Sequence, residues 1–101
     1  MRDVIKKLVA LGPMPDEQAT TDEQVAEYEA LLGSIQKPLT DEEARALVPL
    51  FGPDNYYGFA FSLVHLIESA PHWPLKDSLT DDSNVWVRHL QDAARRAGLL
   101  P

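Results

Sequence analysis

The sequence contains no cysteine. A disulfide framework, a thiolate zinc site and a cysteine nucleophile are therefore excluded. It also lacks any apolar span close to the roughly 20 residues that a membrane helix needs. The short apolar run near its start is interrupted by charges, unlike the apolar segment of a signal peptide. We therefore expect a cytoplasmic protein that does not enter a membrane.

Motifs that carry chemistry are lacking as well. The sequence has no GxSxG nucleophile elbow, no glycine-rich phosphate loop and no glycine-bearing calcium loop. Neighbouring carboxylates do occur, but each group lies at a predicted helix start, where the helix dipole and solvent explain it. These groups are Asp22-Glu23, Asp41-Glu42-Glu43 and Asp81-Asp82. We expect no catalytic residue, no cofactor and no enzymatic activity.

Basic residues are in the minority. Nine lysines and arginines stand against sixteen aspartates and glutamates, which gives a formal net charge of −7. Repulsion from phosphate argues against nucleic-acid binding. The same charge would speed the encounter with a basic protein partner. It would also keep a small domain soluble, which requires no partner at all.

The sequence is rich in helical periodicity and shows no strand alternation. Its 101 residues suffice for one domain, residues 1–101. Two capping boxes are predicted, one from Thr20 or Thr21 with Glu23 or Gln24, and one from Thr40 with Glu43. Five helices are expected: Asp3 to Leu11, one after Thr20 or Thr21, one after Thr40 that bends or stops at Pro49, one over 54–69, and one from a Ser83 cap to Gly98.

The segment 54–69 is apolar almost all the way round a helix. Such a helix is a buried one in a soluble protein. We therefore predict an all-α domain in which this helix is central, arranged as an irregular bundle or a short HEAT-like stack of helical hairpins. A narrow stripe of small or polar residues along it is expected to let a neighbouring helix approach closely, with contact to a partner as the alternative. The stripe consists of Gly58, Ser62, His65 and Ser69.

Two pairs of segments resemble each other within the chain. TDEQVAEYEALLG and TDEEARALVPLFG align at a spacing of 19 residues, and LVALGP resembles LVPLFGP. A common cap followed by an apolar helix can produce such a match by chance. A true repeat would favour stacked helical hairpins.

One pair of residues has the spacing of metal ligands. His65 and Glu68 are three positions apart and would share a helix face. Carboxylate-bridged di-metal sites need two such pairs and further carboxylates. We therefore predict no metal, and keep a small metal-binding protein as an alternative function.

A binding surface is the stronger prediction. From Gly12 to Asp54 there are ten acidic residues and two basic ones, and aromatic residues follow directly. Aromatic anchors within a polar rim are typical of protein interfaces. Trp73, between prolines, is either such an anchor or a lid over the core. The predicted partner-binding residues are Asp41, Glu42, Asp54, Tyr57 and Trp73.

The run DEEARALVPLFGPDNYYGFAFSLVHLIESAPHWPL, followed by NVWVRHLQDAARRAG, is similar to a group of small acidic actinobacterial proteins. These resemble immunity proteins of bacterial polymorphic toxin systems, and the similarity covers about residues 40–98. The resemblance implies a helical inhibitor that covers the active-site cleft of a basic toxin domain with an acidic surface. It transfers no functional residue by position. A self-associating structural or adaptor module remains the alternative, and the protein is expected to be a monomer or a weak homodimer.

Overall fold

A computed structural model describes all 101 residues. It contains α-helices and short 3-10 turns and no strand, which confirms the predicted all-α fold of about five helices. The α-helices are α1 (Asp3–Leu11), α2 (Asp22–Gly33), α3 (Asp41–Leu47), α4 (Phe59–Glu68) and α5 (Val85–Arg96). The 3-10 turns are η1 (Val48–Leu50), η2 (Tyr56–Gly58) and η3 (Lys76–Ser78). None of the helices combines the length and the apolar character needed to cross a bilayer.

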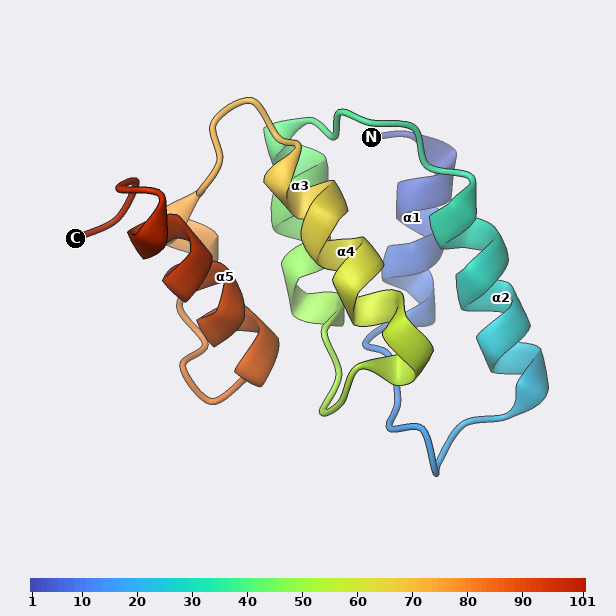
Figure 1. Cartoon of the computed structure of the whole chain (residues 1–101). Coiled ribbons are helices and arrows are strands. Elements are labelled where there is room, and N and C mark those ends of the chain that lie inside the picture. Colours follow the sequence, from blue (N-terminus) through green and yellow to red (C-terminus); the bar gives the residue numbers. More distant parts are fainter.

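The helices form two antiparallel pairs that lie side by side (Figure 1). Helix α1 runs against α2, and α3 runs against α4; α1 then packs on α3, and α2 packs on α4. Helix α5 covers the remaining side of α4. Helix α4 therefore contacts α2, α3 and α5, as expected of the central helix, whereas α1 packs chiefly on α2 and α3.

The two hairpins meet where α1 and α3 end. The backbone N–H of Met14 donates to the carbonyl of Leu50 at 2.9 Å. A Cβ on Gly52 would lie 2.1 Å from the carbonyl oxygen of Met14, so this approach requires glycine. The segments LVALGP and LVPLFGP thus end equivalent, parallel helices. The 19-residue match instead pairs α2 with α3, which run in opposite directions (Figure 1).

Local signals placed several helix ends correctly. Thr21 with Gln24, and Thr40 with Glu43, form complete capping boxes. Helix α3 gives way to η1 at Pro49, because proline cannot donate to the helix. The predicted Ser83 cap was wrong: the side chain of Asn84 accepts the backbone N–H groups of Trp86 and Val87.

The core runs through the interior of both hairpins and under α5. Its side chains are apolar, and each large one stabilises the fold by roughly 1.5–3 kcal/mol on burial. The most completely buried include Ile5, Leu8, Leu47, Leu63, Ile67 and Leu90. The apolar residues Val85 and Ala97, at the two ends of α5, are exposed, because α5 is covered on one side only.

The central helix differs from its prediction in two respects. Helix α4 begins at Phe59 rather than at residue 54, because Tyr56 and Tyr57 have left-handed backbones. It is also not buried all round: Phe61, Ser62 and His65 face solvent. The expected close approach of another helix along this stripe was therefore wrong at Ser62 and His65.

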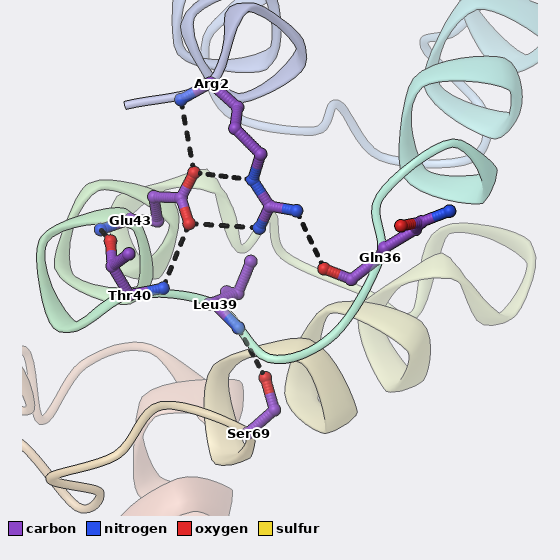
Figure 2. A network of polar contacts seen from close by, with 6 residues as sticks. All are labelled: Arg2, Gln36, Leu39, Thr40, Glu43 and Ser69. Atoms are coloured by element: carbon purple, nitrogen blue, oxygen red, sulfur yellow. Dashed lines mark hydrogen bonds and ion pairs between the residues drawn. The ribbon is translucent and has the colours of Figure 1, made fainter.

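An ion pair between the exposed Arg2 and the buried Glu43 ties the start of α1 to the start of α3 (Figure 2). Glu43 is 1 % exposed, and its carboxylate accepts the Nε and Nη2 groups of Arg2 at 2.9 and 3.0 Å. Arg2 also donates to the carbonyl of Gln36 at 2.8 Å. The hydroxyl of Ser69, just beyond α4, accepts the backbone N–H of Leu39. The 34–40 segment is thereby fixed across one end of the molecule.

Candidate functional site

Three loops meet at the end of the molecule where α2, α4 and α5 begin (Figure 1). They are residues 12–21, 51–58 and 79–84, and none of them contains lysine or arginine. They contain five carboxylates: Asp16, Glu17, Asp54, Asp81 and Asp82. We call this surface the acidic end. Its negative charge is compatible with the fold because three helix N-termini, which carry partial positive charge, lie at the same end.

Asp54 organises the acidic end. Its carboxylate accepts the backbone N–H of Glu17 and that of Tyr56, each at 3.0 Å. Its backbone carbonyl accepts the indole N–H of Trp86 at 2.9 Å. Asp54 therefore joins two loops to α5, and its role is to position neighbouring groups as much as to present charge.

The turn that follows Asp54 is strained. Tyr56 and Tyr57 have φ values of 43° and 57°, in the left-handed region, and Gly58 follows at 88°. For a non-glycine residue this conformation costs on the order of 1 kcal/mol. Such strain persists only where the surroundings enforce it.

Tyr56 shows what enforces the turn. Its side chain is fully buried, and its ring meets that of Tyr28 edge-on with centroids 5.4 Å apart. Its hydroxyl pairs with Thr20 Oγ1 at 2.6 Å. Burial of this large ring and its satisfied hydroxyl offset the backbone strain.

Tyr57 is the residue that the strained turn displays. Its side chain is 55 % exposed. Glu17 holds it at both ends: the Tyr57 backbone N–H donates to Glu17 Oε1 at 2.8 Å, and the Tyr57 hydroxyl donates to the Glu17 carbonyl at 3.1 Å. The ring is thus presented to solvent in a fixed orientation beside a carboxylate.

A second exposed aromatic side chain lies one turn further along α4. Phe61 is 47 % exposed and rests edge-on against Trp86, with centroids 4.8 Å apart. His89 of α5 lies beside both rings. The prediction of a helix that is buried all round would place Phe61 in the core. The only available signal was that an all-round apolar helix must leave apolar surface uncovered wherever no neighbour packs.

A groove crosses the acidic end between the loops. It has a volume of about 450 Å³, and its walls include Pro13, Pro53, Asp81 and the half-exposed Val85. An apolar wall with a carboxylate at its rim suits the aliphatic stem and charged head of a lysine or arginine side chain. Asp81 is exposed and also orders its own turn, since its Oδ1 accepts the backbone N–H of Ser83.

The five predicted binding residues do not form one surface. Asp54 and Tyr57 belong to the acidic end. Asp41, Glu42 and Trp73 lie at the other end of α4, a helix of ten residues and thus about 15 Å long. The predicted set therefore falls into two groups.

In the second group, two residues have structural roles. The Asp41 carboxylate accepts the backbone N–H of His72 at 3.0 Å, and its other oxygen pairs with His72 Nδ1 at 2.6 Å. The His72 backbone N–H is the main cause that lowers the pKa of Asp41. Trp73 is partly buried against the core, in agreement with the predicted lid over the core. Of these three residues only Glu42 is exposed, and its side chain makes no hydrogen bond to the protein.

The pair considered for metal binding is open to solvent. His65 Nδ1 lies 3.8 Å from Glu68 Oε1, and the His65 side chain is 68 % exposed. No group of three histidine or carboxylate side chains is placed to hold a metal ion. The pair is a helical (i, i+3) contact of the kind common on helix surfaces.

The chain matches no protein-family model, no curated protein and no solved structure. The site's geometry therefore carries the functional argument.

Proposed function

We propose that this protein binds a basic protein through the acidic end and inhibits it, as an immunity protein neutralises a toxin domain. One observation carries the proposal: a strained turn holds the exposed Tyr57 ring in place among five carboxylates that no lysine or arginine of the same loops opposes. Backbone strain tends to persist at binding sites, where it pre-organises a contact. The proposal is also in line with the resemblance of residues 40–98 to small acidic actinobacterial proteins, a group whose type resembles immunity proteins.

The proposed mechanism divides the work between charge and aromatic contact. The carboxylates of the acidic end would raise the association rate with a basic cleft. Tyr57 and Phe61 would supply most of the affinity, since aromatic residues are common energetic anchors. The groove beside Asp81 would take a lysine or arginine of the partner. Substrate would then be excluded from the cleft, in the cytoplasm of the producing cell, without any catalytic step by this protein.

The first experiment is a pull-down from the native host with the tagged 101-residue chain at moderate salt. The wild type is expected to retain one stoichiometric, basic partner that elutes at high salt. Tyr57→Gly and Phe61→Ser should lose it, whereas Leu99→Ser, which alters an equally exposed apolar residue near the C-terminus, should not. Tyr57→Gly relieves the left-handed strain, so this variant is expected to fold. Retention of the partner by both site variants would overturn the proposal.

A kinetic measurement then separates the two ends of the molecule. Asp81→Lys should slow association with the captured partner severalfold at low salt and weaken its salt dependence. Glu42→Lys makes the same change at the opposite end and should leave the rate nearly unchanged. If Glu42→Lys slows association and Asp81→Lys does not, the binding surface lies at the α3 end and the acidic end is not the site.

A further inference from the structure

A second groove lies at the far edge of the molecule, between α1 and α2. It has a volume of about 560 Å³ and is the most apolar of the surface grooves. Ala10, Leu11, Ala30 and Leu31 line it, with Lys7 and Glu27 as its polar members. Leu11 and both alanines are exposed. Apolar side chains gathered in one exposed groove with polar residues at its rim are typical of an interaction surface.

The position of this groove explains its composition. Helices α1 and α2 form the outermost hairpin, and α5 lies at the opposite edge (Figure 1). Stacked hairpins bury their faces against the next hairpin, and a terminal hairpin normally carries a polar outer face. Here the outer face carries alanines and leucines instead. It has the character of a surface against which another helical hairpin packs.

The two charged residues of the groove indicate which hairpin could pack against this face. Lys7 of α1 and Glu27 of α2 are exposed, and neither forms a salt bridge or side-chain hydrogen bond within the chain. A two-fold axis lying in this face, perpendicular to the line between them, places Lys7 of each copy opposite Glu27 of the other. The same operation sets apolar surface on apolar surface. The face is thus self-complementary in charge, as a two-fold interface requires.

We propose that the α1–α2 face is a homodimer interface, in which the outer hairpins of two copies pack together with reciprocal Lys7–Glu27 ion pairs. The face is small: α1 has nine residues and α2 has twelve, which gives lengths of about 14 and 18 Å. Two helices of these lengths bury less area than the about 800 Å² per partner of a standard interface. The dimer is therefore weak, with a dissociation constant in the micromolar range. The acidic end stays open in the dimer, which would present two copies of it.

The test is sedimentation equilibrium of the purified 101-residue chain over a wide concentration range. The wild type is expected to pass from monomer to dimer, and Lys7→Glu or Glu27→Lys should weaken the dimer about tenfold or more, since each turns two attractive pairs into two repulsive ones. An equimolar mixture of the two variants should dimerise again, because the heterodimer has two attractive pairs, one of wild-type polarity and one with its charges exchanged. Lys76→Glu, an exposed charge reversal elsewhere, is the matched control.

These results test the dimer independently of the proposed partner binding, because the purified sample contains no partner protein. A wild-type chain that stays monomeric at millimolar concentration would overturn it. So would a dimer that neither single variant weakens, or one that the mixture fails to restore while each variant keeps a wild-type circular dichroism spectrum. Rescue in the mixture is the specific result, since a merely structural role of either residue would not produce it.

Discussion

The guanidinium of Arg2 binds the carboxylate of Glu43 across 41 positions of the sequence, through Nε–Oε2 and Nη2–Oε1 contacts of 2.9 and 3.0 Å. Glu43 simultaneously closes the capping box of α3 by accepting the Thr40 backbone N–H at 2.9 Å. One buried carboxylate therefore starts a helix and also fastens α1 to it (Figure 2).

Replacing either partner of this ion pair should lower the free energy of unfolding, but by unequal amounts. Arg2→Met leaves a buried carboxylate without its counter-ion, and we expect a loss of about 2–3 kcal/mol in the free energy of unfolding, somewhat below the usual range because Arg2 is 40 % exposed. Glu43→Gln leaves an arginine that can turn to solvent, and should cost about 1–2 kcal/mol. Urea denaturation measures both. Arg45→Met, which breaks the exposed pair with Asp77, should cost at most about 1 kcal/mol. A larger stability loss for Glu43→Gln than for Arg2→Met would contradict this explanation.

Stability should fall in acid through Glu43. Its hydrogen bonds from Arg2 lower its pKa from 4.5 to about 2. Because the folded state holds the carboxylate ionised more strongly than the unfolded state does, this contribution is complete above about pH 4.5 and is lost as the pH falls toward 2. Asp41, whose pKa is lowered by the His72 backbone N–H, adds to the same loss. Denaturation curves recorded at several pH values should show a shallower acid slope for Glu43→Gln; parallel slopes would rule out this assignment.

Substitution by alanine should change the stability in opposite directions at two glycines. Gly52→Ala places a methyl group 2.1 Å from the Met14 carbonyl oxygen, and backbone must move, so we expect a loss of at least about 2 kcal/mol. Gly33 ends α2 with open space around it and no left-handed backbone. Gly33→Ala should therefore stabilise by about 0.5–1 kcal/mol. Thermal denaturation of the two variants gives the comparison, and a neutral Gly52→Ala would show that the two hairpins can move apart at this point.

Two large side chains of α4 should differ in their contribution to the stability of the fold. Leu63 is 1 % exposed, and Leu63→Ala should cost roughly 2–5 kcal/mol by leaving a cavity. Phe61→Ala should cost about 1 kcal/mol or less, since nearly half of the ring is already in solvent. Equal losses would mean that Phe61 belongs to the core, and would remove it as a binding anchor. Chemical denaturation distinguishes these outcomes.

The residues of the proposed binding surface could be predicted only in part. Asp54 and Tyr57 were predicted from the acidic stretch and the aromatic residues that follow it, and both belong to the acidic end. Asp81 and Asp82 were assigned only to a helix start. Asp41 and Trp73 looked equally suitable in the sequence. Only the folded chain shows that the Asp41 carboxylate accepts a hydrogen bond from His72 and that Trp73 packs against the core. Phe61 was missed because its exposure depends on where α2, α3 and α5 lie, which periodicity does not encode.

The sequence by itself determined that the chain is helical and where several helices begin or end, because helical periodicity and capping are local. The span Asp3 to Leu11, both capping boxes and the break at Pro49 depend on residues within a few positions of each other. The tertiary structure alone decided the rest: the left-handed Tyr56-Tyr57 turn is held by Glu17, Thr20 and Asp54, and α1 is joined to α3 by Arg2 and Glu43. These contacts join residues brought together only by packing of the core, so nothing in the local pattern could specify them.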